Sequence, residues 1–189
     1  MIKNWKLKIK HLRTGFTIVE TLVSLAIFST SIVALIIVSS QGISDTNFAK
    51  NKLTASYLAQ EGIELVRSIR DTDSNWNTFL TSVSDCIISS TKDGCLIDSG
   101  PHFGSSRLDQ INVLPCAGLC ISPLVYIPST GFYNYDLSNG TNSIFLRSIK
   151  IIPVTSNGND EIQIISNVSW SQGTGTRSVE LTENLFNWQ

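Results

Sequence analysis

The chain has 189 residues, enough for one ordinary domain with its own hydrophobic core, and only 15% of them are charged, which excludes a highly charged disordered protein. The net charge of −1 is unevenly distributed. Residues 1–15 carry five basic side chains and no acid, so residues 16–189 hold nine basic and fifteen acidic ones, a net charge of −6. An acidic body argues against nucleic acid as a partner, because such binding depends on neutralising phosphates.

A long apolar run follows the basic segment. Residues 22–38 contain no charged side chain, and extending the run to residues 16–40 adds only Glu20. As a helix, residues 16–40 would be roughly 37 Å long, enough to cross a bilayer core of about 30 Å. Basic residues before the run predict that residues 1–15 face the cytoplasm and that the body lies outside. We therefore expect a single-pass protein of the cytoplasmic (inner) membrane.

Three fates of this segment are open. A secretory signal would be cut after the apolar run, for which Val38-Ser39-Ser40 offers small residues, although the leader would exceed the usual 15–30 residues. The run would otherwise serve as an uncleaved anchor. A cut before the run would instead leave the hydrophobic helix on the mature protein.

The residues at the junction favour the cut before the run. The string Arg13-Thr14-Gly15-Phe16-Thr17-Ile18-Val19-Glu20 resembles the prepilin-type cleavage and methylation motif of type IV pilins and secretion pseudopilins. The resemblance is close over residues 8–40 and extends to the rest in outline. It implies cleavage after Gly15 by a prepilin peptidase, N-methylation of the new terminus at Phe16, and a role for Glu20 in assembly.

Each position of the motif has a physical reason. Gly15 has no side chain, so an extended backbone can enter a narrow protease site. Cleavage would leave an α-amino group on Phe16 that is largely cationic near neutral pH. Inserting the charged side chain of Glu20 at the centre of a bilayer would cost a free energy of about 2.5–3.5 kcal/mol, and the amine of a neighbouring subunit would reduce that cost. The resemblance implies this pairing; the alternative is that Glu20 is hydrated at the cytoplasmic interface.

The helix is expected to continue to about Arg70, because no proline precedes Pro101 and Gly42 is the only weak point. Apolar residues in 41–70 follow helical spacing, and charged residues occupy the other face, as in an amphipathic helix that lies on a core. The apolar stripe consists of Ala55, Leu58, Gly62, Leu65, Val66 and Ile69.

The region 71–142 is expected to be irregular, and it contains all four cysteines. In an exported domain these predict two disulfides, and pairing of Cys86 with Cys95 and of Cys116 with Cys120 is the simplest of three connectivities. A four-thiolate zinc site is the alternative, although neither spacing is the usual one.

The string Asp71-Thr72-Asp73-Ser74-Asn75 resembles the start of a calcium loop. The glycine expected next is Trp76, and the twelfth position is Ser82 rather than glutamate. We therefore expect a hydrated turn after the helix and no metal site.

Three β-rich segments close the chain: 143–154, 161–171 and 177–186. Turn-like residues separate them, which predicts a three-stranded antiparallel meander with one face available to the amphipathic helix. The expected fold class is α+β and pilin-like. The expected domains are a leader (1–15), a transmembrane and assembly half of the helix (16–42) and an extracellular head (43–189).

The sequence offers no catalytic motif, so we expect no enzyme and no cofactor. His102 is the only histidine that would remain after cleavage, which argues against a histidine-rich metal site. The resemblance implies a minor pilin or pseudopilin that serves adhesion, motility, DNA uptake or secretion. Its partners would be other pilin subunits, the prepilin peptidase/methyltransferase, a membrane assembly platform and the lipid bilayer. The alternative is an uncleaved, membrane-anchored extracellular binding module or enzyme.

Overall fold

The computed structural model describes residues 15–90, 92–98, 111–116, 120–137, 140–154 and 160–187. The chain divides into two compact units with the boundary after Thr46, and each unit is described by itself. Two predicted features lie outside the described residues: the leader up to residue 14, and His102.

Helix α1 spans Ile18–Thr72 and contributes to both units. It contains no proline and passes through Gly42 without a break, as the sequence predicts. In the first unit every helical side chain from Ile18 to Thr46 is exposed. This part of the helix therefore has no core of its own to cover its apolar side chains.

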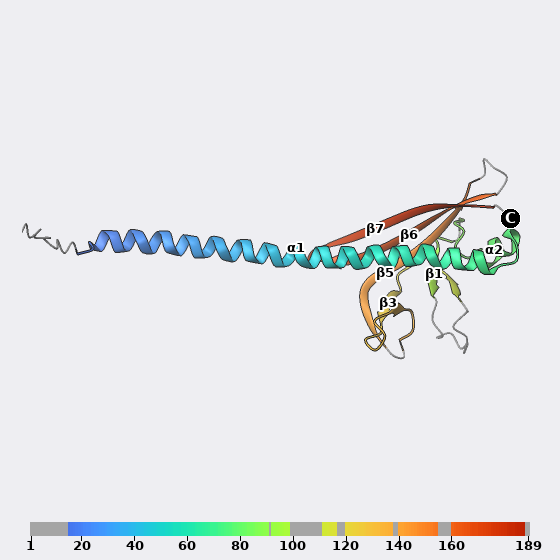
Figure 1. Cartoon of the computed structure of the whole chain (residues 1–189), viewed down its shortest axis with the longest axis horizontal. Coiled ribbons are helices and arrows are strands. Elements are labelled where there is room, and N and C mark those ends of the chain that lie inside the picture. Colours follow the sequence, from blue (N-terminus) through green and yellow to red (C-terminus); the bar gives the residue numbers. More distant parts are fainter. Residues whose placement is uncertain are drawn as a thin grey trace, which may run out of the picture. The chain divides into compact units, whose positions relative to one another are not determined.

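In the second unit the remainder of α1 lies along one face of a β-sheet (Figure 1). The predicted apolar stripe is confirmed, because each of its six residues is buried. Two clusters of side chains form the core. One joins Val66 and Ile69 to Ile149 and Ile164, and the other joins Leu58 to Trp170 and its neighbours.

The strands of the second unit run antiparallel to one another wherever they pair. Their bounds are β1 Cys95–Asp98, β2 Asn112–Pro115, β3 Pro123–Tyr126, β4 Tyr133–Asn134, β5 Thr141–Pro153, β6 Glu161–Gln172 and β7 Gly175–Phe186. Strands β5, β6 and β7 form the predicted meander, with ends within two residues of those expected. Gly173, with φ +61°, occupies the turn between β6 and β7, where a glycine is favoured.

Two expectations for the sheet were wrong. The described residues form a seven-stranded sheet rather than three strands, because β5 pairs with β1 and β3 on its other side, and β2 and β4 extend these. The region 71–142 is accordingly less irregular than predicted, since it supplies β1 to β4 and helix α2 (Trp76–Ser82). Strands of two to four residues are too short for an alternating pattern to be recognised.

Helix α1 packs tightly against the sheet at Gly62. A Cβ atom at this position would lie 2.6 Å from Ser166 Oγ and 3.1 Å from Ile149 Cδ1. Ser166 is fully buried, and its hydroxyl has no hydrogen-bond partner among the described residues. Gly62 therefore sets the distance between helix and sheet by having no side chain.

Gly62→Ala is expected to lower the free energy of unfolding by about 1–3 kcal/mol, because the added methyl group overpacks this contact. Ser166→Ala removes the nearest atom, so the double variant should recover part of the loss. Denaturant unfolding of the full chain in detergent measures both. Equal losses in the single Gly62→Ala and the double variant would show that Ser166 is not the obstacle.

Candidate processing and assembly site

The predicted cleavage site lies just before helix α1. Gly15, Phe16 and Thr17 are exposed and non-helical, and the helix begins at Ile18. No atom lies within 4 Å of the place where a Cβ on Gly15 would stand, and the Phe16 side chain is 77% exposed. The bond between Gly15 and Phe16 is thus in an accessible, non-helical segment that a protease can reach.

Thr17 ends this segment by capping the helix. Its hydroxyl oxygen accepts a hydrogen bond from the Glu20 backbone N–H at 3.3 Å, and its carbonyl oxygen accepts one from the Thr21 N–H at 3.2 Å. A threonine cap followed three residues later by glutamate is the capping-box pattern, which stabilises a helix start. The sequence analysis missed this pattern, although Thr17 and Glu20 have the spacing that reveals it.

Glu20 lies on the first turn of the helix, exposed, and makes no ion pair among the described residues. The positive end of the helix dipole favours a carboxylate there. Glu20 is thus available both to the start of its own helix and to a cation from outside this chain. Arg13 and Thr14, which complete the motif, lie outside the described residues.

The helix that follows is long and apolar enough to span a membrane, and none of its most apolar stretch is buried. Its hydroxyl groups are satisfied within the helix. Ser24, Ser29 and Ser31 each donate to a carbonyl oxygen four residues earlier, at 2.8, 2.7 and 2.8 Å. Hydroxyls bonded in this way can enter an apolar medium at low cost, which fits membrane anchoring.

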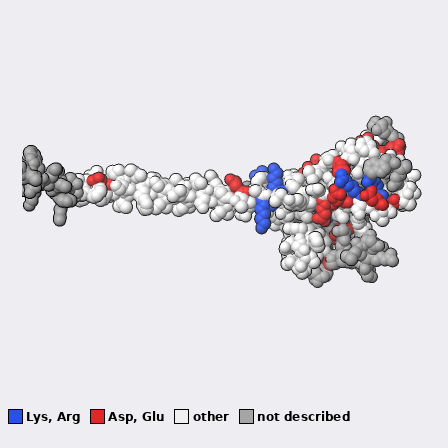
Figure 2. All heavy atoms as spheres, viewed as in Figure 1, with Lys and Arg blue, Asp and Glu red and all other residues white. Residues whose placement is uncertain are grey.

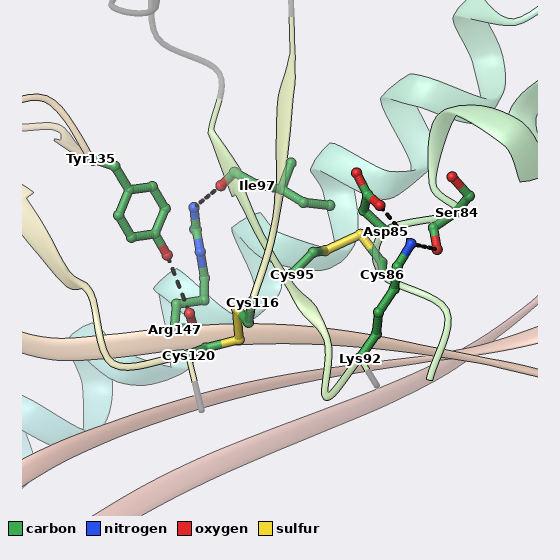
Figure 3. Close-up of a disulfide and its surroundings, with 10 residues drawn as sticks. All are labelled: Ser84, Asp85, Cys86, Lys92, Cys95, Ile97, Cys116, Cys120, Tyr135 and Arg147. Atoms are coloured by element: carbon green, nitrogen blue, oxygen red, sulfur yellow. Dashed lines mark hydrogen bonds and ion pairs between the residues drawn. A yellow bond between two sulfur atoms is a disulfide. The ribbon is translucent and has the colours of Figure 1, made fainter. Parts of the chain in front are cut away.

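Both local cysteine pairs are disulfides in the structure (Figure 3). The Cys86–Cys95 disulfide is fully buried and ties the turn after α2 to the start of β1. The Cys116–Cys120 disulfide closes the loop that follows β2, and the Cys116 N–H donates to the Gly94 carbonyl oxygen at 3.1 Å. The pairing that the sequence favoured as the simplest is therefore the one in the structure.

A buried arginine, which the sequence analysis missed, joins the helix to the sheet. Arg147 is 1% exposed and donates to the carbonyl oxygens of Ile97 at 2.8 Å and Leu58 at 3.2 Å (Figure 3). It also pairs with Glu61 at 3.3 Å. Phe145, Arg147 and Ile149 occupy every second position of β5 and share its inward face. The signal in the sequence was therefore a charged residue at a position that strand alternation assigns to the core.

Tyr135 completes this cluster. Its hydroxyl donates to the Arg147 carbonyl oxygen at 3.2 Å, and its N–H donates to the buried Asp98 carboxylate at 3.1 Å. Burial raises the pKa of the Tyr135 hydroxyl above its ordinary value of about 10, although nearby Arg147 opposes the shift. The folded protein therefore favours the neutral hydroxyl.

Because the folded state raises this pKa, the stabilisation is complete below the unfolded value of about 10 and is lost as the pH rises through the folded value. The free energy of unfolding should therefore fall above about pH 10. In Tyr135→Phe that fall should be shallower, while stability at pH 7 drops by about 0.5–1.5 kcal/mol through the lost hydrogen bond. Denaturant unfolding at pH 7 to 11 measures both, and parallel profiles would contradict the assignment.

The acidic segment after α1 forms a helix end and a new helix start. Asp73 N–H donates to the Ile69 carbonyl oxygen at 3.0 Å, and the Asn75 side chain caps α2 by accepting the Thr78 N–H at 2.9 Å. The described residues contain no group of three or more histidine, cysteine, aspartate or glutamate side chains that could hold a metal ion. Asp71 lies in the last turn of α1, and Asp73 directly follows the helix end at Thr72.

Comparison with protein-family models, with curated proteins and with solved structures found no match for this chain.

Proposed function

We propose that this chain is a structural subunit of a type IV pilus-like filament, a minor pilin or pseudopilin that is cleaved after Gly15 and N-methylated on Phe16. One observation carries the proposal: an accessible, non-helical Gly-Phe bond directly precedes a fully exposed apolar helix with a carboxylate in its first turn. An ordinary membrane anchor requires the apolar helix but neither the Gly-Phe junction nor Glu20.

Cleavage would change the chemistry of the first turn. It removes the basic leader and leaves an amine on Phe16, four residues before Glu20. The amine on Phe16 of one copy pairs with the Glu20 carboxylate of a neighbouring copy. This pairing fixes the stagger between the two copies. The exposed apolar side chains of residues 18–40 would then pass from lipid to contacts with the helices of neighbouring subunits.

The resulting assignment covers location and partners. The uncleaved chain is a single-pass protein of the cytoplasmic membrane with the head outside, and the mature chain stands in a filament at the cell surface. Its partners are other pilin subunits, the prepilin peptidase/methyltransferase, the assembly platform and the bilayer. No catalytic step, metal or cofactor is assigned to it.

Filaments sheared from cells test the proposal. The chain should be present in the sheared fraction without residues 1–15, and deletion of the prepilin peptidase should retain it in the membrane at full length. A chain that stays in the membrane fraction at full length when the peptidase is active would instead be an uncleaved anchor.

A further inference from the structure

Half of the basic side chains that the structure describes in the second unit are paired with carboxylates of the same chain. Four described ones make no ion pair: Lys50, Lys52, Lys150 and Arg177. All others that the structure describes in residues 47–187 are paired, namely Arg67, Arg70, Lys92 and Arg147. The four unpaired cations are thus available to anions outside the molecule.

Two of these cations, Lys52 and Arg177, lie on the same side of α1, at the start of this unit's part of the helix and near the start of β7. The Arg177 guanidinium lies 6.0 Å from the centre of the Phe48 ring, which packs on buried Trp170 at 6.3 Å. Lys52 follows Phe48 by one helical turn, so it lies on the same side of the helix as this contact. We call Lys52 and Arg177 the basic patch.

The other end of the same two elements holds a groove of opposite charge. Between the end of α1 and β7 lies a hollow of about 580 Å³. Its charged residues are Glu64, Arg67, Arg70, Asp71 and Glu183, three carboxylates against two guanidinium groups, which leaves one negative charge. Arg67 donates to Glu183 at 2.8 Å and to Glu64 at 2.6 Å, which fixes both carboxylates in place. We call this the acidic groove.

The two surfaces cannot neutralise each other within one chain. Lys52 and Glu64 are twelve residues apart on α1, roughly 18 Å along its axis. This exceeds the screening length of about 8 Å at physiological salt. In Figure 2 the basic atoms form a band across the helix, and uncharged surface separates them from the mixed acidic and basic atoms further along.

Two different and complementary surfaces on one chain allow a head-to-tail contact, which repeats into an open filament when its rotation does not close into a ring. We propose that the basic patch docks in the acidic groove of a second copy of this chain. The inference rests on the proposed function, and it names the head surfaces that meet in the filament. Such charge contacts fix orientation and register more than they add affinity.

Paired charge reversal in full-length chain tests this docking. Lys52→Glu sets a carboxylate against the acidic groove, and Glu64→Lys sets a cation against the basic patch, so each should lower the amount of chain in sheared filaments at least about tenfold. The combined variant restores opposite charges between copies and should return to within about threefold of wild type. Lys150→Glu makes the same charge change outside the patch and should assemble like wild type.

Folding is checked by the unfolding midpoint, and Glu183 still pairs with Arg67 in the Glu64 variant. A reversal that lowers the midpoint is replaced by Lys52→Gln or Glu64→Gln, with a loss of about threefold expected. If all variants assemble like wild type with the leader removed, the docking is wrong and the proposed function stands. A Lys52→Glu loss that Glu64→Lys does not restore also overturns it and indicates another anion, such as lipid phosphate. A wild-type chain that is never cleaved and never assembles contradicts both proposals.

Discussion

Replacing Glu20 by glutamine is expected to leave cleavage after Gly15 intact and to reduce incorporation into filaments by about 100-fold. In the variant the cationic amine on Phe16 of the neighbouring copy has no carboxylate to pair with, and an unpaired charge in the membrane costs about 2.5–3.5 kcal/mol. Glutamine keeps the hydrogen-bonding pattern of a capping box with Thr17, so the change removes the charge and preserves the helix start. Immunoblots of sheared filaments and of membranes, with the cleaved and uncleaved forms resolved, measure both effects.

Glu20→Ala is the matched variant, because it removes the charge and the capping group together. Equal loss of assembly in both variants supports the charge pairing. Normal assembly of the glutamine variant with loss in the alanine variant would show that Glu20 acts through the start of its own helix. Normal assembly of both would contradict any role in incorporation.

Arg147→Met should produce the largest loss of head stability, about 2–5 kcal/mol of the free energy of unfolding. The variant keeps the volume of the side chain but leaves the Ile97 and Leu58 carbonyl oxygens without the guanidinium that now bonds them. Glu61 is partly exposed and can be rehydrated, so most of the loss comes from the buried carbonyls. Denaturant unfolding of the full chain in detergent, monitored by tryptophan fluorescence, measures it.

Lys150→Met is the matched control on the same strand, since Lys150 makes no ion pair among the described residues and its loss should cost less than about 0.5 kcal/mol. A loss below about 1 kcal/mol for Arg147→Met would contradict the bridging role. It would mean that water replaces the guanidinium, or that the carbonyl bonds carry little net energy.

The long elements were predictable because each has a strong period or composition. An uncharged run followed by an apolar stripe at helical spacing predicts helix α1. Long β-rich segments between turns predict β5, β6 and β7. Ile164 and Trp170, which lie an even number of residues apart in the predicted strand 161–171 and so share one face, are both buried.

The short elements were not predictable for a physical reason. Strands β1 to β4 have two to four residues each. Strands β1 and β3 are stable because they pair with β5, and β2 and β4 because they pair with β1 and β3. Between β1 and β5 only one residue pair is in register, Cys95 with Ile149. Two residues further along, the Arg147 side chain joins the two strands by donating a hydrogen bond to the Ile97 carbonyl oxygen. Long-range pairing of this kind leaves no local pattern.

The functional residues also fall into a group that was predictable from the sequence and a group that was not. Gly15, Phe16, Glu20 and the cysteine pairs were all proposed from local strings, since motif spacing and short loops are sequence properties. The basic patch and the acidic groove each combine α1 with β7, elements more than one hundred residues apart in the chain. Only the fold reveals that Arg177 lies against Phe48, or that Glu183 meets Arg67.

The mass of the amino terminus of the chain isolated from cells tests the central claim most directly. The account predicts that cells with an active prepilin peptidase yield a chain beginning at N-methylated Phe16, and that cells without the peptidase yield residues 1–15 still attached. A chain from peptidase-positive cells that retains Met1, or that begins after Ser40, would contradict it.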